Sequence, residues 1–303
     1  MKIKFTKMHG CGNDYVYVDG KNNIIPDEKK PEIVKFLSDR HFGIGSDGVI
    51  FINPDDNADF EMEMFNADGT RAQMCGNGIR CVAKFVYDKH MTNKTKNLAI
   101  SSFGRNRYLD LTVENGKTKL VKVNMGAPIF DVKEVPVDLE ETELTDISSF
   151  IKKEGITDTK AAVGVKIEVE NRNYEMTCVS MGNPHAVVFL EDSEELSTFD
   201  LEKTGPKFEN NVVFPARTNT EFIHVDDRKN IHMRVWERGT GETLACGTGC
   251  CASVVACILN NKTEDEVTVH VLGGDIICKW DREENLVYMT GPATTVFEGE
   301  IEM

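Results

Sequence analysis

Two cysteines of this chain stand in the same short motif at two distant places. The motifs are Cys75-Gly76-Asn77-Gly78 and Cys246-Gly247-Thr248-Gly249. Each follows an extended apolar run and precedes small and aliphatic residues, which is typical of a strand, a tight turn and a helix. A cysteine at a helix N-terminus meets the positive end of the helix dipole and unpaired N–H groups, so we expect its pKa to lie below ~8.5. The same N–H groups form a binding site for a carboxylate.

A pair of such thiols suits the removal of a proton from one face of a carbon atom and its delivery to the other. One sulfur must be a thiolate while the other is a thiol, and the two exchange roles as the product forms. The α-carbon of an amino acid gives up its proton reluctantly. Helix N-termini aimed at its carboxylate would stabilise the charge that develops there, as an oxyanion hole does. This chemistry does not need pyridoxal phosphate, and we expect no cofactor.

The match between the two motifs extends upstream. Phe65 stands ten positions before Cys75, and Trp236 stands ten before Cys246. A Gly-Asn pair occurs at 12–13 and again at 182–183, so the interval from 13 to 75 is 62 and that from 183 to 246 is 63. This spacing indicates two copies of one domain with a period of about 170 residues. Copies that face each other would bring the two cysteines to one cleft from opposite sides.

The domain boundaries follow from the repeat. We predict a first domain over residues 1–125 and a second over 126–291. The tail, 292–303, alternates apolar and polar residues and is expected to return to the first domain as an extra strand. The acidic stretch 131–160 is expected to be a solvated surface excursion.

Composition excludes several classes of protein. The length of 303 residues suits two domains, and a net charge of −15 argues against nucleic acid as a partner. No apolar run approaches the ~18 residues of a membrane span, and the N-terminus lacks the apolar core of a signal peptide, so we expect a cytoplasmic protein. Nine cysteines, an odd number, make a disulfide framework unexpected. No Cys-x2-Cys pair marks a metal site. Cys250, Cys251 and Cys257 are interpreted as small core residues.

Taken together, the motifs resemble those of the diaminopimelate epimerases. The matching stretches are 8–14, 65–69, 74–81, 182–185, 214–219 and 235–249. The resemblance implies an α+β fold of two pseudo-symmetric domains, each a curled, mixed or antiparallel sheet around a central helix. It also implies interconversion of L,L- and meso-diaminopimelate without a cofactor, in lysine and cell-wall precursor biosynthesis, by a homodimer.

The resemblance assigns site residues motif by motif. Cys75 and Cys246 are implied to be the acid/base pair, and His185 and Glu237 to tune their protonation. The residues implied to bind the substrate are Gly76, Asn77, Gly247 and Thr248 at the reacting carboxylate, and Asn13, Asn66, Asn183, Asn219, Glu237 and Arg238 at the amine and the distal end. At position 48 some family members carry a glutamine that contacts substrate. Here a glycine stands there, so that contact is missing or supplied otherwise.

Other interpretations compete with these roles. Taken singly, the asparagines are typical turn residues, His185 a satisfied structural histidine and Arg238 a member of a surface ion pair. One rival function is a racemase of another amino acid on the same fold. A rival from another class is a thiol redox or metal-binding protein that uses the cysteine pair.

Overall fold

The chain divides into two compact units. The computed structural model describes residues 2–72, 74–157, 159–190 and 192–303. Unit 1 consists of Met1–Asn124 and Thr290–Met303, and unit 2 of Met125–Met289. Each unit is built from a mixed sheet and a few helices, so the predicted α+β class is confirmed.

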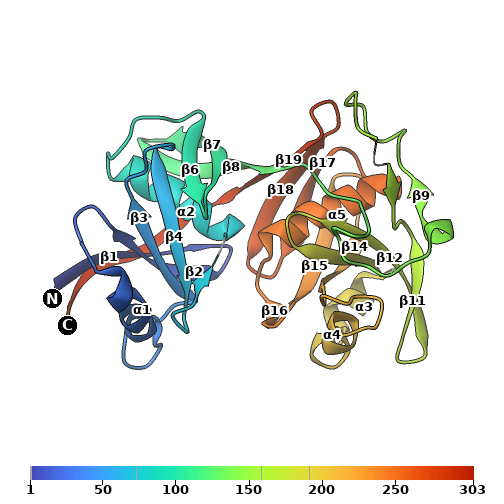
Figure 1. The fold of residues 1–303 in the computed structure, drawn as a ribbon, viewed down its shortest axis with the longest axis horizontal. Coiled ribbons are helices and arrows are strands. Elements are labelled where there is room, and N and C mark those ends of the chain that lie inside the picture. Colours follow the sequence, from blue (N-terminus) through green and yellow to red (C-terminus); the bar gives the residue numbers. More distant parts are fainter. Residues whose placement is uncertain (1, 73, 158, 191) are drawn as a thin grey trace. The chain divides into compact units, whose positions relative to one another are not determined.

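Unit 1 arranges its strands around one helix. Its strands are β1 (Lys2–Gly10), β2 (Asn13–Asp19), β3 (Gly48–Asn53), β4 (Phe60–Asn66), β5 (Arg71–Ala72), β6 (Leu98–Ser102), β7 (Arg105–Glu114), β8 (Lys117–Gly126) and β20 (Thr294–Glu302). Its helices are the 3-10 turn η1 (Asp27–Lys29), α1 (Lys30–Ser38) and α2 (Gly76–Asp88). Helix α2 packs against β1, β2, β6 and β7, while α1 packs against β2, β3 and β4 (Figure 1).

Unit 2 encloses a helix in the same way. Its strands are β9 (Thr145–Asp146), β10 (Lys160–Ala161), β11 (Val165–Val169), β12 (Arg172–Ser180), β13 (Pro184–Phe189), β14 (Asn219–Val225), β15 (Asn230–Glu237), β16 (Gly241–Thr243), β17 (Glu266–Val271), β18 (Gly274–Asp281) and β19 (Leu286–Pro292), which ends in unit 1. Its helices are η2 (Glu141–Glu143), α3 (Ser193–Thr198), α4 (Leu201–Glu209) and α5 (Gly247–Leu259). Helix α5 is apolar on every side. This composition suits its position, since strands β12, β13, β14, β17 and β18 surround it (Figure 1).

The pairing of strands repeats between the units. In unit 1, β1 pairs antiparallel with β2, β2 parallel with β3, β3 antiparallel with β4, and β4 parallel with β6. In unit 2, the order β12, β13, β14, β15 and β17 shows the same alternation of senses. The central helix follows the fourth strand and a short hairpin strand in both units. The repeat inferred from the sequence is therefore a repeat of topology.

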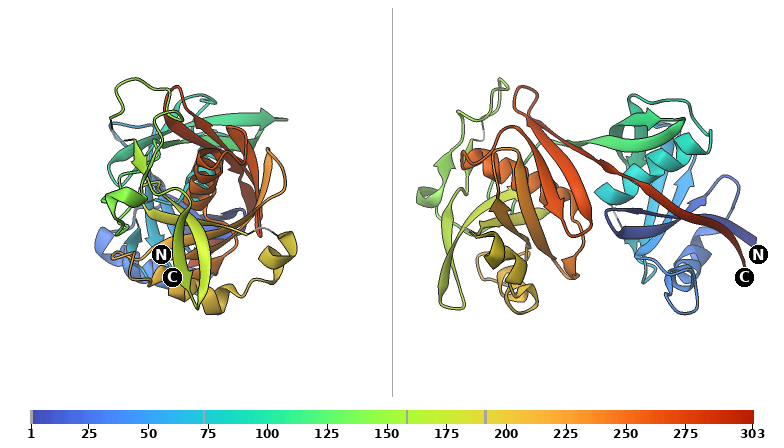
Figure 2. Two further views of the ribbon diagram at one scale, coloured as in Figure 1. Left: turned by 90° about the vertical axis from the view of Figure 1, so that its right-hand side faces the viewer. Right: turned by 180° about the vertical axis from the view of Figure 1, so that it is seen from behind.

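The two ends of the chain lie side by side in unit 1. Strand β20 pairs antiparallel with β1, from Lys2 opposite Glu302 to His9 opposite Thr294. Figure 2 shows the two strands running together. The last residues of the chain thus complete the sheet that its first residues begin.

The expectation of a solvated excursion at 131–160 is wrong in part. Val135, Val137 and Ile147 are buried, and the two valines belong to the core cluster that includes Phe208 and Phe222. The stretch is polar overall, but its scattered aliphatic residues cover apolar surface of unit 2 that would otherwise meet water.

Among the described residues, no helix combines the length and apolarity required to cross a bilayer.

Gly48 stands where no side chain fits. A Cβ atom at this position would lie 2.0 Å from the backbone oxygen of Phe65 and 3.0 Å from the Tyr15 ring. A side chain at this position, such as the glutamine that the resemblance implies for some relatives, would meet the backbone of β4, because β3 and β4 approach too closely.

Replacing Gly48 by alanine should destabilise the protein by at least about 2 kcal/mol, since the backbone of β4 must move to admit the methyl group. Urea unfolding of Gly48→Ala against the parent measures the loss. Gly116→Asn is the matched control, because Gly116 has a φ of +74° and nothing within 4 Å of its Cβ position, and asparagine tolerates that backbone. Equal stability of Gly48→Ala and the parent would contradict this account.

Candidate active site

Cys75 is the N-cap residue of α2. Its backbone is extended, with φ −128° and ψ 116°, and its sulfur accepts a hydrogen bond from the Gly78 N–H at 3.2 Å. The thiol donates to Oδ1 of Asn13 at 3.0 Å. Cys75 is half-buried, whereas the other cysteines are buried. The predicted position of this cysteine at a helix N-terminus is thus observed.

Asp47 fixes the direction of the Asn13 amide. The Nδ2 group of Asn13 donates to Oδ2 of Asp47 at 2.8 Å, and Arg40 pairs with the other oxygen of that carboxylate at 2.9 Å. An ionised carboxylate only accepts hydrogen bonds, so the amide must turn its NH2 group to Asp47 and its oxygen to Cys75.

Tyr15 also lies at the Cys75 thiol. The residue is 5% exposed. Burial raises the pKa of its hydroxyl, and the neighbouring Cys75 adds to the effect, so the group stays a phenol. Neither Tyr15 nor Asp47 is among the residues assigned from the sequence.

Cys246 is the N-cap residue of α5 and is 5% exposed. Its sulfur lies 3.5 Å from the Thr248 hydroxyl. Burial raises the pKa of this thiol well above its usual value, and the charges of Glu237 and Glu221 raise it further. Hydrogen bonds from Thr248 and the Gly249 N–H act in the opposite direction but are weaker. The expected lowering of the pKa is therefore wrong for Cys246, because desolvation and two carboxylates outweigh the helix N-terminus.

Glu237 stands beside Cys246 at the end of β15. Burial raises the pKa of this carboxyl, and the charge of Glu221 does so as well, while the hydrogen bond from Thr243 opposes them. The Thr243 hydroxyl donates to Oε1 of Glu237 at 2.5 Å. The carboxyl is thus held in one place next to the thiol.

His185 is fully buried and bonded through both ring nitrogens. Nδ1 lies 2.7 Å from Oε1 of Glu221, and Nε2 lies 3.1 Å from Oδ1 of Asn183. Both the His185 and the Glu221 side chains have no exposed surface. Glu221 was not assigned from the sequence, although a carboxylate directly before the apolar pair Phe222-Ile223 in a strand was an available signal.

Asn219 and Arg238 are joined to each other. The Asn219 side chain donates to the Pro184 oxygen at 2.7 Å and accepts from the Arg238 N–H at 2.9 Å. The Arg238 guanidinium donates to the Ala216 oxygen at 2.9 Å. Asn219 therefore holds the loop that carries Arg238, and the binding role of the two residues stays a prediction.

The structure gathers the assigned residues into one set in each unit. Asn13, Gly76 and Asn77 lie around Cys75, and Asn183, His185, Asn219, Glu237, Arg238, Gly247 and Thr248 lie on the strands and the helix that carry Cys246. Asn66 ends β4 opposite Gly48, where its amide donates to the Thr70 hydroxyl at 3.1 Å. Cys250, Cys251 and Cys257 are fully buried core residues, as predicted. Over the described residues, no group of His, Cys, Asp and Glu is arranged to hold a metal ion.

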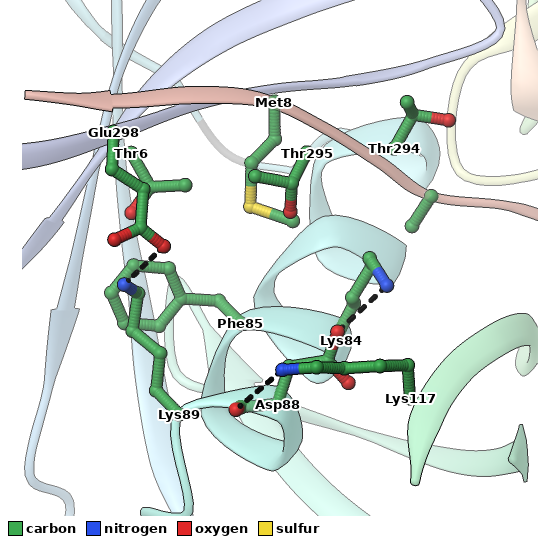
Figure 3. A pocket seen from close by; sticks show the side chains of 11 residues that line it. Thr6, Met8, Lys84, Phe85, Asp88, Lys89, Lys117, Thr294, Thr295 and Glu298 are labelled. Carbon is green, nitrogen blue, oxygen red and sulfur yellow. Dashed lines mark hydrogen bonds and ion pairs between the residues drawn. The ribbon is translucent and has the colours of Figure 1, made fainter. Parts of the chain in front are cut away.

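A cavity of about 460 Å³ lies in unit 1 at the other end of α2. Its charged groups satisfy one another, since Lys84 bonds Asp88 and Lys89 bonds Glu298, each at 2.7 Å (Figure 3). Lys117 donates to the Asp88 oxygen at 3.3 Å. None of the assigned site residues lines this cavity.

Comparison with known proteins places the chain in a family. The family model described as diaminopimelate epimerase matches residues 5–130 and 177–296. The chain belongs to the diaminopimelate epimerase family. It is 51% identical to the diaminopimelate epimerase of Agathobacter rectalis over 99% of this chain and 100% of that protein. It is also 51% identical to the diaminopimelate epimerase of Methanococcus maripaludis, again over 99% and 100% of the two chains.

Solved structures share the fold at low identity. A phenazine biosynthesis protein of the PhzF family from Bacillus anthracis matches with a TM-score of 0.67 and 18% identity over 100% of both chains. A hydroxyproline epimerase from Agrobacterium vitis matches with a TM-score of 0.64 and 12% identity, over 99% of this chain and 92% of that one. These similarities confirm the architecture and leave the substrate to be argued from the site.

Replacing Glu237 by glutamine should lower the pKa of Cys246, because it removes a negative charge that disfavours the thiolate. The thiolate, which is the species that reacts with iodoacetamide, would then form at lower pH. Peptide mass spectrometry after timed alkylation across a pH series measures the rate at Cys246, with Cys75 as the internal reference. A Cys246 profile that stays in place or moves to higher pH in Glu237→Gln would contradict this electrostatic account.

Proposed function

We propose that this protein is a cofactor-independent isomerase that interconverts L,L- and meso-diaminopimelate with Cys75 and Cys246 as the two acid/base residues. The observation that carries the proposal is the pair of N-cap cysteines, one on the buried helix of each unit, in a chain that matches the family along its length. The epimerases of lysine and cell-wall precursor biosynthesis act on this substrate, and the proposal extends the activity to this chain. A homodimer in the cytoplasm, with a small amino acid and no nucleic acid as partner, belongs to the same proposal.

The mechanism needs one thiolate and one thiol at opposite faces of the α-carbon. Cys246 is suited to start as the acid, because burial and two carboxylates raise its pKa. Cys75 would then be the base: as a thiolate it removes the α-proton of the first isomer, and the thiol so formed donates a hydrogen bond to the Asn13 oxygen that faces it. In the reverse direction the roles exchange.

The first turns of α2 and α5 would hold the reacting carboxylate. The N–H groups of Gly76, Asn77, Gly247 and Thr248 stand in these turns, where helical residues have no intrahelical acceptor. They would stabilise the negative charge that spreads from the α-carbon into the carboxylate as the proton leaves. This stabilisation takes the place of the electron sink that pyridoxal phosphate provides elsewhere.

The domain boundaries are part of the proposal. We take residues 1–125 with the tail 292–303, and residues 126–291, as the two copies of one ancestral domain. The repeated order of parallel and antiparallel pairs supports this division.

Proton NMR of pure L,L-diaminopimelate with reduced protein in D2O tests the function. We expect the meso isomer to appear with deuterium at the inverted α-carbon, while unreacted substrate keeps its α-proton early in the reaction, because a different thiol delivers the new hydrogen. Cys75→Ala and Cys246→Ala should each lose at least about 10³-fold in kcat, as removal of a general acid or base does. Cys257→Ala, at a buried cysteine of the same helix as Cys246, is the control and should keep its activity. Full turnover in either active-site variant would refute the two-cysteine mechanism.

Arg238 distinguishes this substrate from amino acids without a second carboxylate. Arg238→Met should raise KM for diaminopimelate by about 10- to 100-fold, the loss expected for charge-assisted hydrogen bonds to a carboxylate. Arg172→Met, in which an exposed arginine paired with Glu195 is replaced, is the matched control. An unchanged KM in Arg238→Met, or faster turnover of an amino acid without a distal carboxylate, would favour the racemase alternative.

A further inference from the structure

Equivalent positions in the two units carry different chemistry. Asn13 begins β2, and Asn183 directly precedes β13, the equivalent strand of unit 2. With these two residues aligned, the strand registers match Tyr15 with His185 and Ile50 with Glu221. The contacts agree with this alignment. A Cβ atom at Gly78 would meet Ile50 at 2.9 Å, and one at Gly249, in the same place on the second helix, would meet Glu221 at 2.5 Å.

The fold itself needs only an apolar side chain at this position. Ile50 fills it in unit 1 and is fully buried. Glu221 fills it in unit 2, also fully buried, and among the residues that the structure describes its Oε2 atom has no hydrogen-bond partner. A buried carboxylate with an unsatisfied oxygen costs stability relative to an aliphatic side chain. A role in chemistry, rather than packing, therefore accounts for Glu221.

The hydrogen bonds around His185 identify that role. The ring stands between two oxygens, Oε1 of Glu221 on its Nδ1 side and Oδ1 of Asn183 on its Nε2 side. A hydrogen must lie on each of these two lines, since oxygen and nitrogen lone pairs that face each other repel. A neutral ring carries only one hydrogen. The second hydrogen therefore lies between Nδ1 and Oε1 of Glu221, bound either to the ring or to the carboxyl.

We infer that Glu221 is a positioning residue, which through His185 holds the Asn183 amide so that its NH2 group is presented to the substrate. The carboxyl anchors Nδ1, the ring then donates from Nε2 to the Asn183 oxygen, and the amide is left with its donors free for an acceptor of the substrate, a carboxylate oxygen.

In unit 1 the equivalent asparagine amide has the opposite orientation. Asp47 accepts directly from the Nδ2 group of Asn13, so Asn13 presents its oxygen to the Cys75 thiol. In unit 2 a histidine stands between the carboxylate and the asparagine, and its presence reverses the amide. The two half-buried asparagines thus offer an acceptor in one unit and a donor in the other. This inference rests on the proposed function for the identity of the substrate, but the orientation of Asn183 does not depend on it.

Substitutions copied from the other unit supply the test. Glu221→Ile installs the residue that unit 1 tolerates, and it removes the anchor of the ring. We expect kcat/KM for diaminopimelate to fall by about 10- to 100-fold, as misplacement of a substrate contact does. Glu221→Gln should retain most activity, because its amide can donate to Nδ1 and leave the Nε2 hydrogen on Asn183. Thr220→Val is the matched control, since it replaces an unpartnered buried hydroxyl of the same strand by the valine that unit 1 has at position 49.

A double-mutant comparison separates positioning from a structural role. If Glu221 acts through Asn183, Glu221→Ile should cause little further loss in an Asn183→Ala background. Full activity of Glu221→Ile, an equal loss in Glu221→Gln, or losses that multiply in the double variant would each overturn the inference. Thermal unfolding of every variant shows whether it is folded.

Nitrogen NMR of protein labelled with 15N-histidine gives a readout without substrate. Of the seven histidines, His185 is assigned by the signals lost in His185→Gln. We expect Nε2 of His185 to carry a hydrogen in the parent and in Glu221→Gln, and an unprotonated Nε2 in the parent would overturn the inference. If Nε2 is protonated but the parent does not convert diaminopimelate, the proposed function fails and the orientation of Asn183 stands.

Discussion

The start of a buried helix is the constraint on which the rest of this structure depends. Helices α2 and α5 are each covered by strands, so the N–H groups of their first turns cannot rely on bulk water for partners. The Gly-x-Gly sequence after each N-cap cysteine keeps these groups close to the surrounding strands. In the proposed mechanism a substrate carboxylate would satisfy them, and the cysteine that caps the helix would stand beside the reacting carbon. The same backbone N–H groups thus belong both to the packed start of the helix and to the proposed carboxylate site.

The two copies of the fold have diverged at the positions under these helix starts. In unit 1 these positions hold the uncharged side chains of Tyr15 and Ile50, whereas His185 and Glu221 place a buried acid–base pair under α5. Burial, Glu237 and Glu221 together raise the pKa of Cys246. The topology thus repeats while the electrostatics of the two helix starts differ.

Much of this was readable in the chain. The spacing of the cysteine motifs revealed the repeat, and the motifs identified the family and its fold class, because glycine turns and helix caps are local features that leave a direct imprint on sequence. The stretch 131–160 is less predictable, since its overall polarity conceals Val135, Val137 and Ile147, which are buried by neighbours distant in sequence.

The sequence by itself determined that two cysteines cap two helices, that the halves repeat, and which side chains accompany each motif. Only the tertiary structure decided the electrostatics. The pKa of Cys246 depends on burial and on carboxylates from β14 and β15, and the direction of Asn13 depends on Asp47, 34 residues away along the chain. Charge–charge interactions act through space, so the residues that set them are chosen by strand register rather than by neighbourhood in sequence.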